Sequence, residues 1–580
     1  MLKRLIDTKD LPISKRTRNN HPILYKELSI QTQPYISATE FENFCKNDKI
    51  IDWFSVLSQK FDLLENCHVN PLLFLFQKGI EYEEKIINLI RQKTSLPLQK
   101  HSSLPTSREY NKQTNHSLEK KDMQMVFQAM QRGDPIIYSA YLCDRKECIR
   151  GIPDLLIRND YVSTMFGDDY TPPYGNHSRT IFGDYYYLPI EIKFSSIYLD
   201  KSDKYILNIN RSKFYKTQLF TYCKILGELQ GFLPRYAFII GKRTVSHDKT
   251  IHDSLSKPGL IDYHYRDNNI VDGFYQGLDW LRSVKKDGAS WSMTHHLFPN
   301  MKNDHPIYQQ DKKEISEEIG EITEIWQCST INRERAFENG IFSTKDCRLD
   351  SDILGIADSY KESVDNILKI NRGELGDYYP LHFTKNIHNF KETKNEMFVD
   401  FETVRDSLDL DTFGEDEFIF LIGVWYKGKY TSFMMKTLEK DEEIRVVSEF
   451  YTFWKENGSP QCWCWYAEKE MWDRCMKRND KALSLNWVDL YEVFYGEHFV
   501  VKGCKNFKLK SYVKSLSKLG KISVEMPPDS CGNGLEAMLT AWKYYKSQNR
   551  GGSLTDVIKY NELDCVYLEK LLMFIRGLDS

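Results

Sequence analysis

The sequence lacks several features that would assign it to a specialised class of protein. No apolar run approaches the roughly 18 residues that a membrane span needs, and the basic amino terminus is not followed by the apolar stretch of a secretory signal. The net charge is only −3 at pH 7, so any binding to nucleic acid must come from local patches. The 580 residues, 41% hydrophobic and 28% charged, predict a soluble globular protein of roughly two to four domains without a membrane partner.

Cysteine is present but not organised into a recognisable framework. The 13 cysteines are scattered, and their odd number favours a reducing compartment, so we expect an intracellular, cytoplasmic protein. The close pairs Cys143/Cys148 and Cys462/Cys464 lack a matching second pair that would complete a zinc site. Both pairs are therefore interpreted as structural.

Residues 1–40 are polar and basic, and we predict a flexible arm. The basic pair Lys3-Arg4 and the cluster at 15–18 have a spacing like that of a bipartite nuclear signal. A phosphate-contacting arm or a plain solvated tail explains these charges equally well. A nuclear location stays open if the host is eukaryotic.

An acid and an amine share one face of a strand predicted at residues 188–194. Side chains of a strand alternate between its faces, so Glu191 and Lys193 point to the same side. Upstream, Asp154 interrupts another apolar strand, where a charge is unfavourable unless a divalent ion neutralises it. Asp154 and Glu191 can hold a hard ion such as Mg²⁺, while Lys193 can orient water or stabilise charge on a phosphate. A solvated charge pair is the alternative.

Two helical patterns flank these strands. Residues 71–91 repeat apolar side chains at helical spacing and carry Glu83, with Glu81 and Glu84 as neighbouring choices of register. After the acid strand, Gln218 and Tyr222 lie four residues apart and so share one face of a helix. An exposed acidic face and an ordinary amphipathic helix are the simpler explanations of the two patterns.

Taken in chain order, these elements resemble the signature of RecB-like PD-(D/E)XK nucleases. The resemblance implies a restriction-endonuclease-like α/β domain over residues 41–245, with Asp154 and Glu191 as metal ligands. Some relatives hold an iron–sulfur cluster with cysteines after the last core helix. Because no cysteine lies between Cys223 and Cys328, we expect no iron–sulfur cluster here. The four matching elements are Gly79-x3-Glu83, Pro153-Asp154, Glu191-x-Lys193 and Gln218-x3-Tyr222, whose residues Glu83, Asp154, Glu191, Lys193, Gln218 and Tyr222 are the implied catalytic set.

A second set of acids lies in the last third of the chain. Asp400 and Glu402 occupy one face of a predicted strand, and Tyr560 and Asp564 occupy one face of a carboxy-terminal helix. The predicted order of strand, strand, strand, helix and strand resembles an RNase H-like sheet. The D-x-E pair and Tyr-x3-Asp resemble the tyrosine subclass of DEDD-type 3′-to-5′ exonucleases, in which the aspartate ligates a metal and the tyrosine positions water. A buried Tyr–Asp hydrogen bond is the structural alternative.

The intermediate acid of that pattern is where the sequence departs from the family. A glutamate replaces the usual aspartate, and we choose Glu470, with Asp489 as the fallback. Seven lysines and no acid occur between residues 502 and 521, a stretch that can follow a phosphate backbone or form a solvated face. The expected nucleic-acid contacts are Lys502, Lys505, Lys508, Lys510 and Lys514.

The whole pattern resembles the RecB-like nucleases in which a PD-(D/E)XK domain is fused to an RNase H-like exonuclease domain. We expect a multidomain α/β protein with a helical region containing a hairpin at 246–390 and the RNase H-like domain at 391–580. The resemblance implies an exonuclease that hydrolyses phosphodiester bonds with Mg²⁺ or Mn²⁺, on DNA in preference to RNA. The alternatives are a nucleic-acid-binding scaffold without turnover and an RNA exonuclease working through the second domain alone. Protein partners are unknown.

Overall fold

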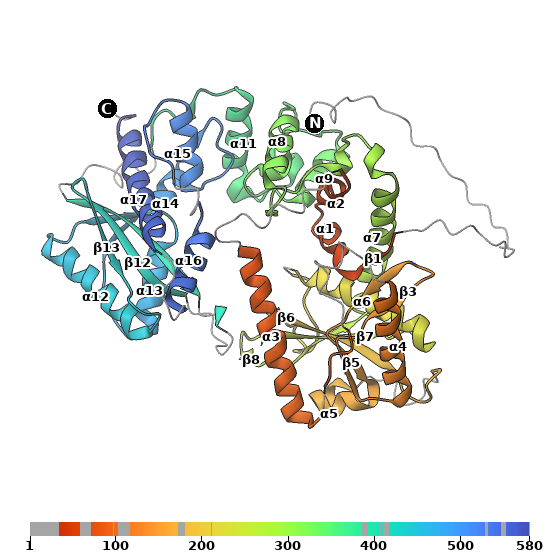
Figure 1. Ribbon diagram of the computed structural model, residues 1–580. Coiled ribbons are helices and arrows are strands. Elements are labelled where there is room, and N and C mark those ends of the chain that lie inside the picture. Colours follow the sequence, from red (N-terminus) through yellow and green to blue (C-terminus); the bar gives the residue numbers. More distant parts are fainter. Residues whose placement is uncertain are drawn as a thin grey trace. The chain divides into compact units, whose positions relative to one another are not determined.

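The chain folds into two compact units (Figure 1). One contains residues up to 61 and 75–299, and the other contains residues 62–74 and from 300 onward. The helical region predicted at 246–390 is divided between them, and the basic clusters predicted in the arm lie outside the described residues. The computed structural model describes residues 34–57, 71–96, 98–102, 116–171, 180–209, 211–384, 393, 395–405, 408–409, 417–527, 532–546 and 553–578.

The first unit is built on a mixed sheet in the order β2-β5-β6-β7-β8, with β9 paired to β7. The long strand β6 runs antiparallel to β5 and parallel to β7, so it is covered by neighbours on both edges. Its residues are mostly buried, as the run of apolar side chains predicts. The strands are β2 (Ile136–Tyr138), β5 (Leu155–Arg158), β6 (Tyr187–Tyr198), β7 (Tyr236–Val245), β8 (Ile251–His252) and β9 (Gly259–Asp262).

Helices and a small second sheet complete this unit. Helix α6 packs on β6 and on the small sheet, and its inward face belongs to the same hydrophobic core as α7. The small sheet has the order β1-β4-β3, with strands β1 (Ile36–Ser37), β3 (Leu142–Asp144) and β4 (Ile149–Gly151). The helices are α1 (Glu42–Cys45), α2 (Ile50–Leu57), α4 (His116–Arg132), α5 (Val162–Phe166), α6 (Ser212–Gln230) and α7 (Asn268–Asp287), together with α3 (Pro71–Thr94) from residue 75 onward.

The second unit is built on a five-stranded sheet in the order β13-β12-β11-β14-β15. The central strand β11 is antiparallel to β12 and parallel to β14, and β14 is parallel to β15. The predicted succession of three strands, a helix and a strand is confirmed by β11, β12, β13, α12 and β14. The strands are β11 (Glu396–Arg405), β12 (Glu417–Tyr426), β13 (Lys429–Met434), β14 (Gln461–Cys464) and β15 (Asn486–Asp489), and β10 (Tyr378–Tyr379) pairs with β16 (Val500–Val501).

Two hydrophobic clusters cover the faces of this sheet. Val399 and Phe401 of β11 lie in one, and Phe398 lies in the other together with α17 and residues from the 322–383 region. That region therefore packs within the second unit. The helices are α8 (Gln309–Ile319), α9 (Thr330–Glu338), α10 (Ser351–Leu354), α11 (Asp358–Arg372), α12 (Lys440–Glu456), α13 (Glu468–Arg478), α14 (Leu490–Gly496), α15 (Leu509–Lys518), α16 (Gly534–Lys546) and α17 (Thr555–Arg576). No helix in the described part of the chain is long and apolar enough to cross a membrane.

Asp52 is a buried acid of helix α2 in the first unit. Burial raises the pKa of its carboxyl to about 7, although hydrogen bonds from Asn43 Nδ2 (2.8 Å) and Trp280 Nε1 (2.7 Å) oppose this shift. The neighbouring acids Glu40 and Asp48 raise the pKa further. The carboxyl therefore binds its proton more tightly in the folded state than in the unfolded chain.

This raised pKa predicts a pH-dependent contribution to stability. The contribution is complete below about pH 4 and is lost as the pH rises through about 7. Relative to wild type, Asp52→Asn should gain about 4 kcal/mol in the free energy of unfolding between pH 4 and 8. Urea unfolding at several pH values measures this difference, and the exposed acid of α7 provides the control Asp272→Asn. A difference between Asp52→Asn and wild type that does not change with pH would contradict the prediction.

Candidate active sites

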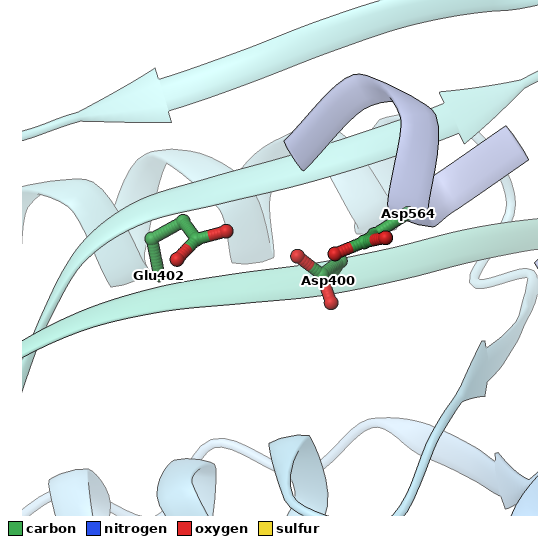
Figure 2. A group of neighbouring side chains, drawn as sticks. All are labelled: Asp400, Glu402 and Asp564. Carbon is green, nitrogen blue, oxygen red and sulfur yellow. The ribbon is translucent and has the colours of Figure 1, made fainter. Parts of the chain in front are cut away.

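Three carboxylates from distant parts of the chain meet in the second unit (Figure 2). Asp400 and Glu402 project from the same face of β11 because they are two residues apart, and Asp564 reaches them from α17, which packs on that strand. One ligand atom from each lies within 4.8 Å of the others. The predicted convergence of these acids is therefore present.

Burial and mutual repulsion make this cluster unfavourable while it is fully charged. Burial, and then the charge of Asp564, raise the pKa values of Asp400 and Glu402 well above their ordinary range. Burial raises the pKa of Asp564 only to about 6, because the Lys510 ammonium and a hydrogen bond from Tyr560 favour its ionised form. Lys510 Nζ lies 3.0 Å from Asp564 Oδ2 and also above the ring of Tyr560, at 3.4 Å from its centroid.

Asn561 holds Asp400 in place, and the sequence did not single it out. Its Nδ2 donates to the backbone oxygen of Asp400 at 3.1 Å and to Oδ2 at 2.7 Å. Its own oxygen accepts a hydrogen bond from the Tyr430 hydroxyl at 2.8 Å, and the side chain is fully buried. The available signal was its position beside Tyr560, because a polar residue on the inward face of an amphipathic helix needs a buried partner.

The donor set of this cluster suits a hard divalent cation. Three carboxylates supply the oxygen ligands that Mg²⁺ and Mn²⁺ prefer. Asp564 Oδ1 is buried, and no described residue gives it a hydrogen bond. A buried carboxylate oxygen without a donor is unfavourable unless a cation or water satisfies it, so the residues fit a bound metal.

The predicted residues of the first unit also come together. Lys193 Nζ donates to Glu191 Oε1 (2.8 Å) and to Gln218 Oε1 (3.1 Å), and Gln218 Nε2 donates to the same glutamate oxygen at 2.7 Å. Gln218 Nε2 also donates to the Tyr222 hydroxyl at 2.9 Å, while Asp154 Oδ2 accepts the backbone N–H of Ile192 at 2.6 Å. Five predicted residues from β6, α6 and the start of β5 therefore form one network.

Electrostatics link this network to the predicted acid of α3. Burial and the charges of Glu191 and Glu83 raise the pKa of Asp154 well above its ordinary range. Burial lowers the pKa of Lys193, but Glu191 and Asp154 outweigh it and the net change is upward. Glu83 Oε1 accepts the Tyr138 hydroxyl at 3.1 Å.

The neighbouring glutamates of α3 have different surroundings from Glu83. Glu81 pairs with Lys78 at 2.8 Å, and Glu84 is exposed. The acids here are less tightly grouped than in the second unit, because among the described residues only Asp400, Glu402 and Asp564 form a group of three ligands within 4.8 Å. Glu191 Oε2 is nevertheless buried, without a hydrogen bond from any described residue.

Comparison with known proteins identifies part of the chain. Residues 397–575 match the RNase_H superfamily. No curated protein and no solved structure shows a significant match to the chain. The carboxy-terminal part is thus an RNase H-like domain, as predicted. Its family indicates a nuclease that acts on nucleic acid. RNase H-like nucleases generally use divalent metal ions. The match does not reach the first unit, whose resemblance to PD-(D/E)XK nucleases stays a prediction.

The intermediate acid of the RNase H-like domain requires a correction. Glu470 does not reach the cluster, because its side chain is 75% exposed and its Oε1 atom lies 3.9 Å from Arg474 Nε on the next turn of α13. Glu468, two residues earlier, is buried, and its charge acts on both Asp400 and Glu402. Burial raises the pKa of Glu468 to about 8. The fallback Asp489 instead caps α14 by accepting the backbone N–H of Tyr491 at 2.8 Å.

The predicted lysine contacts have different surroundings in the RNase H-like domain. Lys502, Lys508 and Lys514 are exposed. Lys505 forms an ion pair with Glu324, and Lys510 binds Asp564 as described above. Three of the five lysines therefore present their charges to solvent.

Replacing one ligand should separate metal binding from folding. Asp400→Asn removes one of the mutually repelling charges, and its amide oxygen can still accept a hydrogen bond from Asn561, so the melting temperature in EDTA should not fall. A metal that binds only the folded state adds about 2.7 kcal/mol to the free energy of unfolding at 100 times its Kd. Asp400→Asn should lose the part of the Mn²⁺-induced rise in melting temperature that this cluster supplies. Thermal unfolding with EDTA and with Mn²⁺ tests this, and Glu470→Gln is the exposed control that should keep the increase. An equal Mn²⁺ effect in wild type and Asp400→Asn would argue against the metal site.

Gly423 gives an independent test of the role of Asn561. It lies opposite Asp400 in the β11–β12 ladder, and a Cβ atom there would lie 1.6 Å from Asn561 Oδ1. Gly423→Ala should therefore displace Asn561, destabilise the fold by about 1–3 kcal/mol and weaken Mn²⁺ binding. Gly534→Ala is the matched control, because no atom lies within 4 Å of its added Cβ. Mn²⁺ titration calorimetry showing unchanged affinity in Gly423→Ala would exclude this role.

Proposed function

We propose that the protein is a divalent-metal-dependent nuclease that hydrolyses phosphodiester bonds at two sites. The observation that carries the proposal is the meeting of Asp400, Glu402 and Asp564 inside the region that matches the RNase_H superfamily. Separate acids on a strand and a helix are brought together at the expense of repulsion, an arrangement that a non-catalytic sheet does not need. The second site is the network around Glu191 in the first unit.

In the RNase H-like domain, the chain's residues hold the ligands and neutralise their charge. Asp400, Glu402 and Asp564 would hold Mg²⁺ or Mn²⁺, which when bound supplies Lewis-acid stabilisation of the charge that develops on the phosphate. Asn561 fixes the orientation of Asp400, and Glu468 is the proposed fourth acid. These contacts orient the ligands before the substrate binds.

Tyr560 and Lys510 complete the proposed site of this domain. The Tyr560 hydroxyl is the group that we assign to positioning the attacking water, since it lies one helical turn before Asp564 and hydrogen-bonds to it. Lys510 favours the ionised form of Asp564, which is the form that a cation ligand requires.

In the first unit, Lys193 is the proposed electrophilic group and Asp154 and Glu191 are the proposed ligands. The ammonium of Lys193 is held by Glu191 and Gln218 and is 20% exposed, so it can meet a phosphate oxygen or a water molecule. Gln218 and Tyr222 fix the orientation of Glu191, and Glu83 adds a further acid. Support for this site comes from the network and from the predicted motif order.

We propose DNA as the preferred substrate and exonucleolytic cleavage as the mode. DNA follows from the resemblance of the first unit to RecB-like nucleases, whereas RNA suits the RNase H-like domain equally well. The exposed Lys502, Lys508 and Lys514 are proposed to contact the phosphate backbone.

Cleavage assays with one variant per site test the proposal. Single- and double-stranded DNA and RNA, labelled at either end, are incubated with Mg²⁺ or Mn²⁺ and the intact chain. Asp564→Asn should reduce the activity of the RNase H-like site by about a hundredfold or more, because it removes a ligand of the metal. Lys193→Met should reduce the activity of the first unit to a similar extent, because it removes the cation proposed to meet the reacting phosphate. The product ladder from each labelled end reports exonucleolytic or endonucleolytic cleavage and its direction.

Exposed residues on the same helices provide the controls. Asp556→Asn in α17 and Lys213→Met in α6 change the same charges at exposed positions and should leave both activities unchanged. Loss of activity in Asp564→Asn alone would assign catalysis to the RNase H-like domain and exclude catalysis at the Glu191 network of the first unit. Binding of every substrate without cleavage by wild type would instead show a scaffold.

A further inference from the structure

Tyr466 combines exposure with an unusual backbone conformation. It lies in the connection between β14 and α13, and with Tyr265 it is the most exposed large hydrophobic side chain among the described residues, at 66%. Its φ angle is 74°, and it is the one Phe, Tyr or Trp among the described non-glycine residues with positive φ. A bulky residue in this left-handed conformation is unfavourable and persists only where its surroundings hold it.

The strand register places this connection at the same end of the strands as the acids. Strand β14 is parallel to β11, with Trp463 opposite Phe398, so both strands run toward the same end of the sheet. Asp400 lies two residues beyond Phe398, and Trp465 lies two residues beyond Trp463. Ligands of sheets with parallel strands bind outside the carboxyl ends of those strands. Tyr466 therefore follows its strand at the end where the candidate cluster lies.

Two carboxylates fix the backbone at Tyr466 and at the residue before it. Asp489 Oδ1 accepts the backbone N–H of Tyr466 at 2.9 Å, and Glu468 Oε2 accepts that of Trp465 at 3.0 Å. The Tyr466 ring also meets the Tyr491 ring edge to face, with centroids 4.9 Å apart. The ring is thus held in one position by contacts at its backbone and at one edge, while most of its surface faces solvent.

We propose that Tyr466 is a stacking platform for a nucleobase of the single strand bound at the RNase H-like site, an inference that rests on the proposed function. A held, exposed aromatic ring needs little ordering to stack, and every base offers it a π-face, so the contact tolerates any sequence. Glu468 links the platform to the cluster, because it binds the backbone beside Tyr466 and its charge acts on Asp400. The platform positions the strand relative to the carboxylates through a base, independently of phosphate contacts.

Binding of strands with and without bases tests this inference. Fluorescence anisotropy in EDTA compares the intact chain's affinity for a fluorescein-labelled oligothymidine of about 12 nucleotides and for an equally long strand of abasic residues. Tyr466→Gly removes the ring but adopts positive φ without strain. This variant should bind the base-bearing strand about tenfold more weakly and the abasic strand as wild type does. Tyr466→Phe keeps the stacking face and should stay within about twofold of wild type.

The controls separate a failed platform from a failed function. Tyr265→Ala removes an equally exposed tyrosine from the first unit and should bind as wild type does. Circular dichroism checks folding, and Tyr466→Asn, which also tolerates positive φ, replaces the glycine variant if that variant does not fold. Two results would overturn the platform while the proposed function stands, provided that wild type binds and cleaves nucleic acid. In the first, Tyr466→Gly binds the base-bearing strand as tightly as wild type does. In the second, its affinity falls equally for the base-bearing and the abasic strand. A wild-type chain that neither binds nor cleaves any strand overturns both.

Discussion

The confinement of like charges is the constraint on which the RNase H-like domain depends. Asp400, Glu402 and Asp564 are held within 4.8 Å on the inner side of a strand–helix contact, where burial and repulsion both favour the protonated forms. Among the described residues, the Lys510 ammonium and the Asn561 amide oppose this penalty. A buried acid cluster that is only partly neutralised by its own protein is suited to a cation that arrives from solution.

The two units solve the same electrostatic problem with different parts of the chain. In the first unit the compensating lysine, Lys193, is two residues from Glu191 on the same strand, so the pair forms by local alternation and α6 only adds Gln218. In the RNase H-like domain the compensating lysine comes from α15 and meets an acid of α17. The first arrangement is readable from a short motif, whereas the second needs two helices to pack side by side.

The connection after β14 shows how one carboxylate can serve two purposes. Glu468 belongs to the acid cluster through its charge and to the loop through its hydrogen bond with the backbone of Trp465. Asp489 likewise caps α14 and holds the backbone of Tyr466. Glu468 thereby ties the geometry of the loop to the candidate metal position, and Asp489 ties it to the start of α14.

Local periodicity in the sequence was enough to place several of the candidate residues. Alternation along a strand put Asp400 with Glu402 and Glu191 with Lys193, and a four-residue helical spacing put Gln218 with Tyr222 and Tyr560 with Asp564. Only the tertiary structure decided which of these pairs meet, that Glu468 rather than Glu470 faces the cluster, and that Lys510 and Asn561 complete it. The physical reason is that a motif's spacing specifies a face, whereas the partner of that face depends on how helices and strands pack. The rotation of α13 against the sheet, which buries one glutamate and exposes the other, is set by that packing.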